Sequence, residues 1–297
     1  MLFIKILRLF CFLMCIQFFG YAQQISSEHK LKFDNFSIDK GLSQSTVLSV
    51  FNDDKGFIWI GTRNGLNKFN GYDFKIFQHK IDDSTTINGN TIFDINQDKN
   101  GQMYVATNKG LSLFDAYTNQ FENYQFSEPY KNATPYAISI DKHSRLWLST
   151  NQGLLLFDPK ERKFSHLSNL LNSDFEKAKS ASYTSYLDDN DLLWVGTNNN
   201  GIFALDLADS ENTFKIRHNF SPEALNDIRI EGILPAKGNK LWVATYGKGL
   251  FLLNKEGHVE KHYHKYSEVE NQKLTHDNIR SIASDNDDNN MDLPRTW

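Results

Sequence analysis

A short motif that recurs five times along the chain constrains the fold more strongly than any other feature of the sequence. In each copy an aromatic residue is followed by an aliphatic residue, a small residue and Thr, and a Gly stands three or four positions after the Thr. The aromatic residues lie 45, 43, 47 and 48 residues apart, and they are Trp59, Tyr104, Trp147, Trp194 and Trp242. A period in the forties, built from short alternating strands, is typical of β-propeller blades.

The first copy shows how one repeat divides into strands, because Asn64-Gly65 and Asn70-Gly71 are tight-turn signals between apolar segments. These signals predict four strands, at residues 46–51, 57–62, 66–69 and 72–77. The other copies predict four strands each, within residues 92–124, 136–167, 184–218 and 228–263. A short helix is predicted at 174–181. The sequence therefore predicts an all-β fold, a β-propeller of four-stranded blades.

The predicted ring of blades is incomplete, with five blades and the start of a sixth. Residues 279–284 read as the first strand of the sixth blade, and the repeat stops at the turn 285–289. Residues 31–36 resemble a fourth strand, which in closed propellers completes the final blade. We therefore expect a partial β-propeller over residues 23–289. Its open edge predicts that the isolated fragment is poorly stable.

The tail, residues 290–297, does not fit the repeat. A shifted reading frame across Met291-Asp292 would restore a Trp opposite Trp59, which favours a frameshift in a longer gene. The next shifted codon cannot encode the expected Gly, which weakens this hypothesis. A downstream nucleotide sequence without further repeats in either frame would contradict it.

Residues 1–22 predict a secretory signal peptide. Two basic residues precede an apolar run at 9–19, and Gly20 and Ala22 supply the small residues of a cleavage site before Gln23. An uncleaved membrane anchor is the alternative, although a spanning helix needs about 20 apolar residues and this run is shorter. We therefore expect a periplasmic protein.

The charge and cysteine content exclude several classes of function. Without residues 1–22 the formal net charge falls from −4 to −6, because that segment contains Lys5 and Arg8 and no acidic residue. An acidic chain is a poor partner for nucleic acid, which needs a basic face. Both cysteines, Cys11 and Cys15, lie in the same segment, so the mature chain offers no disulfide, cysteine nucleophile or thiolate metal site. We expect no cofactor.

The repeat resembles the two-component regulator propeller repeat, in which Gly precedes the aromatic residue and the sequence continues as Gly–Thr–x–x–Gly–Leu. The resemblance covers roughly residues 31–289, and the opening segment Phe36–Val47 is similar to the segment that follows the signal peptide in periplasmic sensors of hybrid two-component systems. In that family two seven-bladed propellers precede a further β domain, a membrane helix, a histidine kinase, a receiver and often a DNA-binding domain. The resemblance implies the N-terminal part of such a sensor.

The resemblance also implies what this chain would work with. In full-length relatives the partners are the remaining propeller blades and the kinase modules, and the propellers take part in sensing oligosaccharides from degraded polysaccharides. No membrane-spanning run follows residue 22 and no kinase nucleotide site is found, so signalling output does not carry over. The expected ligand is an oligosaccharide or another small molecule.

The repeated aromatic residues, Trp59, Tyr104, Trp147, Trp194 and Trp242, are predicted to pack between adjacent blades, where they could not meet a ligand. The Asp-rich turns could suggest calcium, but 285–290 lacks the Gly and Glu of a calcium loop. His262 and His264 share a face of an outer strand, with His258 nearby. We expect neither group to bind a metal.

A ligand-binding rim is predicted from strand direction. The loop between the second and third strands shares a face with the connections between blades. Asn at turns is common for backbone reasons alone, yet these loops gather amides, cations and a Tyr on one face. The rim residues are Arg63, Asn64, Asn108, Lys109, Asn151, Gln152, Asn198, Asn199, Asn200, Tyr246 and Lys248. Longer connections at 78–89, 127–134 and 168–182 would wall the same face.

The predicted function is therefore that of an extracytoplasmic ligand-sensing propeller fragment of a hybrid two-component signalling receptor. We expect it to sense oligosaccharides and to have no catalytic activity of its own. One alternative is a polysaccharide-acting lyase or hydrolase, since some propellers are enzymes, but no paired carboxylate or His/Tyr constellation recurs. The other alternative is a protein-interaction scaffold. A glycan array without hits, together with capture of a partner protein, would favour the scaffold.

Overall fold

The computed structural model describes residues 35–171, 175–208, 214–254, 256–283 and 295–296. The chain divides into two compact units, residues 1–36 and 37–297, and the strands described below all belong to the second. The predicted signal peptide, the strand residues 31–34 and the turn 285–289 lie outside the described residues. Within the described residues, no helix has the length and apolar character needed to cross a membrane.

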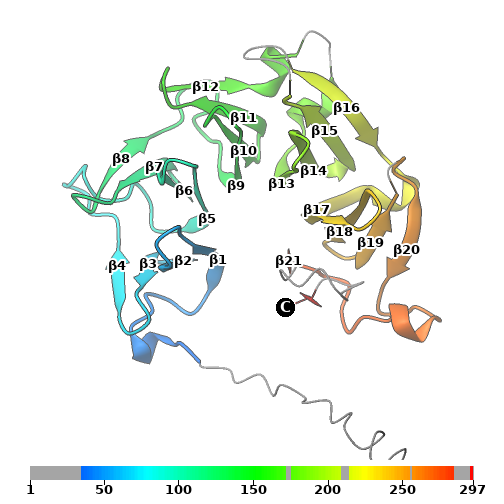
Figure 1. The fold of residues 1–297 in the computed structure, drawn as a ribbon, viewed down its shortest axis with the longest axis horizontal. Helices are drawn as coiled ribbons and strands as arrows, with labels where there is room; N and C mark the ends of the chain where they lie inside the picture. Colours follow the sequence, from blue (N-terminus) through cyan, green and yellow to red (C-terminus); the bar gives the residue numbers. More distant parts are fainter. Residues whose placement is uncertain (1–34, 172–174, 209–213, 255, 284–294, 297) are drawn as a thin grey trace, which may run out of the picture. The chain divides into compact units, whose positions relative to one another are not determined.

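The first three sheets each contain four consecutive antiparallel strands, in the order of the chain (Figure 1). The first sheet consists of β1 (Val47–Asn52), β2 (Ile58–Thr62), β3 (Gly65–Phe69) and β4 (Phe74–Phe77). The second consists of β5 (Ile92–Gln97), β6 (Met103–Thr107), β7 (Gly110–Asp115) and β8 (Gln120–Tyr124). The third consists of β9 (Pro135–Ile140), β10 (Leu146–Thr150), β11 (Gly153–Asp158) and β12 (Lys163–His166).

The fourth and fifth blades have the same internal order but are joined into one eight-stranded sheet. The fourth blade consists of β13 (Ser182–Leu187), β14 (Leu192–Asn200), β15 (Ile202–Asp206) and β16 (Lys215–Phe220). The fifth consists of β17 (Asn226–Ala236), β18 (Lys240–Thr245), β19 (Leu250–Leu253) and β20 (Val259–Tyr263). The joint is a pairing of β14 with β17, in which Asn198 lies opposite Arg229 and Asn200 opposite Asn226.

The start of a sixth blade follows. β21 (Ile282–Ala283) pairs with β22 (Arg295–Thr296), which comes from the tail that does not fit the repeat. Helical structure among the described residues is restricted to short 3₁₀ turns, one of which, Glu176–Lys179, falls inside the predicted helix 174–181. The predicted fold, an incomplete propeller with five four-stranded blades and the start of a sixth, is confirmed.

Neighbouring blades pack through an apolar layer built around the repeated aromatic residue. Trp59 of the first blade lies in one cluster with Ile95 and Val105 of the second, and Trp147 of the third lies with Leu193 and Val195 of the fourth. All five repeated aromatic side chains are buried. Within this unit, the first strands of successive blades contact one another on the inner side of the row of sheets (Figure 1).

The close approach of blades explains the small residue in the motif. A Cβ added to Gly61 would lie 2.8 Å from Cγ2 of Ile92, the first residue of the next blade's inner strand. A Cβ on Gly196 would lie 2.6 Å from Cγ2 of Ile230 in the same way. Both distances are below any normal carbon–carbon contact. The Gly, Ala or Ser after the aliphatic residue therefore makes room for the neighbouring strand.

Candidate functional site

The loops between second and third strands lie on the face that also carries the connections between blades, which we call the rim face. The opposite face, with the remaining turns, is the turn face. On the rim face the Thr of each motif holds its loop: the Thr62 hydroxyl donates to the Gly65 carbonyl at 2.9 Å and accepts the Asn64 N–H at 3.0 Å. Thr107 and Thr150 make the same contacts in their blades.

Two of the predicted rim amides are engaged within the protein. The Asn108 side-chain oxygen accepts the Thr91 N–H at 3.2 Å, and that of Asn151 accepts the Thr134 N–H at 2.7 Å. Both amides thereby position the connection that enters their own blade. Arg63 and Lys109 are exposed, and the Gln152 carbonyl contacts the buried His166 ring at 2.9 Å. These loops are ordered mainly by contacts with their own connections.

Asn198, Asn199 and Asn200 were predicted to form a loop, and this prediction is wrong, because they continue β14. The connection to the fifth blade, residues 221–225, is much shorter than that at 78–91, so it brings the start of β17 alongside them. Asn198 is opposite Arg229 in the resulting pairing. Asn199 is exposed with a positive φ of 75°, and the Asn200 amide donates to the Ser180 hydroxyl at 2.7 Å.

The last two rim residues belong to the fifth blade. The Lys248 ammonium donates to the carbonyls of Ala224 and Asn226, at 3.3 and 3.2 Å, and so fastens the short connection. Tyr246 is 43% exposed, and the guanidinium groups of Arg229 and Arg280 lie 4.7 and 4.8 Å from its ring centre. Among the predicted rim residues, Tyr246 is therefore an aromatic ring with two cations beside it.

Sequence reasoning missed a row of side chains next to Tyr246. Each inner strand has a register shift at its rim end, between Ile92 and Asp94 in β5 and at the matching place in β1, β9, β13 and β17. Bulges of this kind re-aim one side chain and are common beside functional sites. The residues at the shift are Leu48, Phe93, Tyr136, Tyr183 and Glu231. Arg280 stands at the corresponding position before β21.

Apart from Leu48, these residues join Arg229 and Tyr246 in a contiguous cluster that runs from the second blade to the start of the sixth. Phe93 meets Tyr136 edge-on at 5.2 Å, and Tyr136 stacks on Tyr183 with ring centres 4.6 Å apart. The Arg229 guanidinium lies 4.8 Å from the Tyr183 ring centre, so it is held between Tyr183 and Tyr246. We call Phe93, Tyr136, Tyr183, Arg229, Glu231, Tyr246 and Arg280 the bulge cluster.

A single carboxylate connects the two cations of the bulge cluster. Glu231 accepts a hydrogen bond from Arg229 Nε at 2.7 Å and a second one from Arg229 Nη2. Arg280 Nη1 lies 3.8 Å from the same carboxylate, and its side chain is 65% exposed, against 27% for Arg229 and 12% for Glu231. Burial raises the pKa of the Tyr136 phenol, so this ring stays neutral.

A half-buried carboxylate stands next to the cluster in β5. Asp94, the residue after Phe93, accepts the Ile138 N–H of the next blade at 2.7 Å and the Ile95 N–H at 2.9 Å. Burial raises the pKa of Asp94 to about 7, although both hydrogen bonds oppose this shift. Asp94 therefore links two inner strands and titrates near neutral pH.

Described residues line cavities on both the rim face and the turn face. One, of about 640 Å³ on the rim face, is lined by Asn108 and Lys109 together with His79, Asn88 and residues 125–127 and 131–134. The connections predicted to wall this face at 78–89 and 127–134 do line it.

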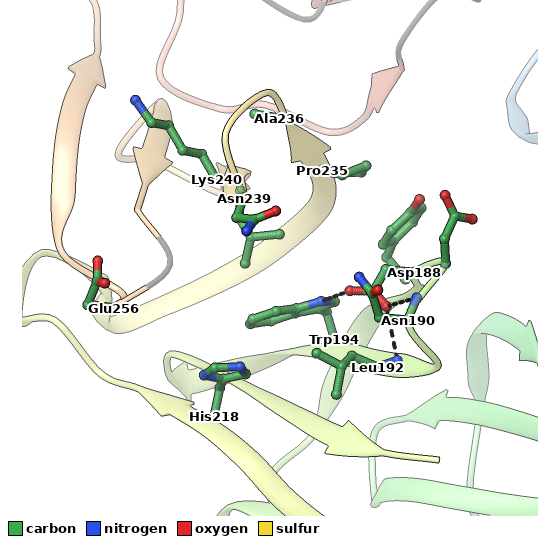
Figure 2. Close-up of a pocket in the computed structure, with 13 residues that line it drawn as sticks. Asp188, Asn190, Leu192, Trp194, His218, Pro235, Ala236, Asn239, Lys240 and Glu256 are labelled. Carbon is green, nitrogen blue, oxygen red and sulfur yellow. Dashed lines mark hydrogen bonds between the residues drawn. The ribbon is translucent and has the colours of Figure 1, made fainter. Parts of the chain in front are cut away.

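The second cavity lies on the turn face between the fourth and fifth blades and measures about 570 Å³ (Figure 2). Its floor is Trp194, stacked on His218 with ring centres 5.2 Å apart. The Trp194 indole donates to Asp188 at 3.0 Å, and the same carboxylate accepts the N–H groups of Asn190 and Leu192. Burial lowers the pKa of His218, which favours its neutral ring.

The Asp of this turn has the same role in other blades. Asp53 accepts the Trp59 indole N–H at 2.8 Å, and Asp141 accepts that of Trp147 at 3.2 Å. The predicted calcium alternative for the Asp-rich turns gains no support from this geometry, since these carboxylates face N–H donors. Among the residues that the structure describes, no three His, Cys, Asp or Glu side chains are grouped to hold a metal ion. His262 stacks on Phe251 and His264.

Comparison with known proteins finds sequences that are similar to parts of this chain. Residues 41–64 and 86–109 match the family model of the two component regulator propeller. The first two copies of the motif therefore lie in segments that are similar to the two component regulator propeller repeat. A segment of 56 residues is 48% identical to Histidine kinase P4 of Formosa agariphila, and it makes up 19% of this chain and 4% of that kinase.

Solved structures share the fold. The extracellular domain of a hybrid two component system from B. thetaiotaomicron has a TM-score of 0.57 at 23% identity, covering 85% of this chain and 39% of that one. PorZ, a surface component of the type-IX secretion system of Porphyromonas gingivalis, has a TM-score of 0.61 at 20% identity, covering 81% and 36%. A streptogramin B lyase has a TM-score of 0.57 at 15% sequence identity, and the match covers 77% of this chain and 72% of the lyase. At these identities the likeness concerns the fold alone, and this chain spans well under half the length of the first two.

Proposed function

We propose that this propeller is the ligand-sensing part of an extracytoplasmic receptor of the hybrid two-component type, and that it binds oligosaccharides without catalysing a reaction. The repeat family and the segment shared with a histidine kinase support the sensor role. The predicted signal peptide supports a periplasmic location, and the secreted protein should then begin at Gln23. In such a receptor the remaining blades and the kinase modules would be its partners.

The bulge cluster is the observation that carries the oligosaccharide proposal. Sugar-binding sites combine aromatic faces, which pack against the apolar faces of sugar rings, with a few fixed polar groups. Tyr246 is 43% exposed and Tyr183 is half-buried, and both rings stand beside Arg229 and Glu231, whose hydrogen-bonding groups are held by each other. Inner-strand positions are more rigid than loop positions, which suits a recognition site.

A glycan array followed by calorimetry on the full chain tests the proposal. We expect binding of at least one oligosaccharide, and Tyr183→Ala should weaken it roughly ten-fold, about 1.4 kcal/mol. Tyr117→Ala is the matched control, because Tyr117 is 95% exposed on the turn between β7 and β8 and should leave affinity unchanged. No bound glycan, or equal losses in the two variants, would overturn the proposal.

The enzyme alternative is tested in the same samples. The likeness to a streptogramin B lyase concerns the fold alone, and the bulge cluster contains one carboxylate, Glu231, already bound to Arg229. We therefore expect the bound glycan to be recovered intact after prolonged incubation. Its depolymerisation, checked by mass spectrometry, would favour the enzyme.

A further inference from the structure

We infer that the bulge cluster selects saccharides that carry an acidic group, with Arg280 binding the acid and the exposed part of Tyr246 contacting the sugar. This inference rests on the proposed function and specifies its ligand class. It follows from the charge, exposure and spacing of three residues, Arg229, Glu231 and Arg280.

The charge of the cluster is opposite to that of the chain. Two guanidinium groups and one carboxylate leave a surplus of one positive charge at this site, whereas the whole chain has a formal net charge of −4. The surplus resides where a ligand could use it, because Arg280 is 65% exposed and Arg229 is the more enclosed partner of Glu231. A carboxylate or sulfate on a sugar is the ligand group that this surplus favours.

Arg280 is also oriented. Its guanidinium lies 4.8 Å from the Tyr246 ring centre and 3.8 Å from Glu231, a separation too long for a full hydrogen bond. A planar guanidinium held by an aromatic face presents its remaining N–H groups as a fork that matches a carboxylate. The carboxylate of an acidic ligand could accept the Arg280 N–H groups that are too far from Glu231 to form hydrogen bonds with it.

The charge of Glu231 affects how tightly this site binds an acidic ligand. It fixes Arg229 by two hydrogen bonds, but its charge also attracts Arg280 and repels an incoming anion. Removing the charge while keeping the shape should therefore strengthen binding of an acidic ligand. A site for neutral sugars would respond in the other direction, because the carboxylate is a strong acceptor for sugar hydroxyl groups.

The test is a titration of the full chain with pairs of trisaccharides that have the same linkage and differ only in the acidic group. The three pairs are galacturonate with galactose, glucuronate with glucose, and mannuronate with mannose. We expect an acidic trisaccharide to bind at least ten-fold more tightly than its neutral counterpart, with affinity that falls as salt rises. Arg280→Gln should remove that preference, and Glu231→Gln should raise affinity for the acid three- to ten-fold.

Arg217→Gln is the matched control. Arg217 is 66% exposed and lies 3.7 Å from Asp206 on the outer strand β16, so it has the exposure and the carboxylate neighbour of Arg280 at a remote place. Arg217→Gln should leave both saccharide affinity and melting temperature at their wild-type values. Arg280→Gln should also melt at the wild-type temperature, so that its loss of binding is not due to unfolding. Equal binding of acid and neutral sugars, or weaker acid binding by Glu231→Gln, overturns the inference and leaves the proposed function standing. Binding of no saccharide overturns both.

Discussion

At the scale of single residues, the Asp that stands six positions before the repeated aromatic residue organises the first turn of the first four blades. Asp188 accepts two turn N–H groups and the Trp194 indole N–H, and so joins the turn to the core between blades (Figure 2). In the fifth blade Ala236 occupies this position and cannot accept. Ala236 lines the turn-face cavity together with Asp188.

Adjacent carboxylates give a sharp test of this role. Asp188→Ala should lower the free energy of unfolding by about 2 kcal/mol, because three donors lose their acceptor. Asp189→Ala should change it by less than about 0.5 kcal/mol, since Asp189 is exposed. Urea unfolding measures both. Equal losses would show that the carboxylate acts through general charge effects and not through its hydrogen bonds.

Residue patterns predicted the roles of the repeated aromatic side chains but not the bulge cluster. Burial of a residue such as Trp59 follows from its place in the period. The outward turn of Tyr136 does not, because a bulge inserts one residue into a strand without altering the apolar pattern around it. The bulge position falls at the same distance from each motif Thr, so an alignment of the five inner strands could have revealed the row.

At the scale of strands, Asp94 connects the inner strands β5 and β9. Its pKa, raised to about 7, means that the folded protein favours the neutral acid. The stability that this provides, relative to an uncharged side chain, is complete below about pH 4 and is lost as pH rises through 7. The linkage therefore runs opposite to that of a salt-bridged Asp.

The variant Asp94→Asn isolates this contribution. Between pH 5 and pH 8 the wild type should lose on the order of 2 kcal/mol relative to Asp94→Asn, because only the wild type must ionise a group that folding removes from water. Thermal melts across that range measure the difference. A difference that stays constant with pH would mean that Asp94 ionises as it would in water.

Strand positions were predicted closely, and the exception has a physical cause. β2 (Ile58–Thr62) and β3 (Gly65–Phe69) agree to within one residue with the predicted strands 57–62 and 66–69, since apolar alternation and Gly turns define them. The extension of β14 through Asn200 was not predicted, because three consecutive Asn residues favour a turn. The short connection at 221–225 overrides that local preference by placing β17 alongside.

At the scale of the whole unit, one flank of the first blade exposes apolar side chains. In the second blade the equivalent side chains are buried. Val50 and Ile58 are 66% and 38% exposed, whereas Ile95 and Met103, at the same positions of the second blade, are each 3% exposed. Among the described residues no further blade packs on this flank. An exposed apolar surface of this kind favours association.

We expect the full chain to self-associate through this flank. The double variant Val50→Lys, Ile58→Lys should raise the monomer fraction in sedimentation velocity several-fold, because it places charge in an apolar contact. Ile81→Lys is the control, since Ile81 is 89% exposed in a connection between blades. A wild type that is monomeric at tens of micromolar would contradict the expectation, as would equal effects of the two changes.

The strand pairing between β14 and β17 gives the fourth and fifth blades a common backbone ladder, whereas the first three described sheets have no strand pairing with one another. Side-chain packing can slide by small amounts, but a ladder must break before it opens. Bending of the row should therefore concentrate at the seams between the first four blades. The fourth and fifth blades would move as one rigid body, carrying Tyr183 and the Arg229 beside it against Tyr136 of the neighbouring third blade.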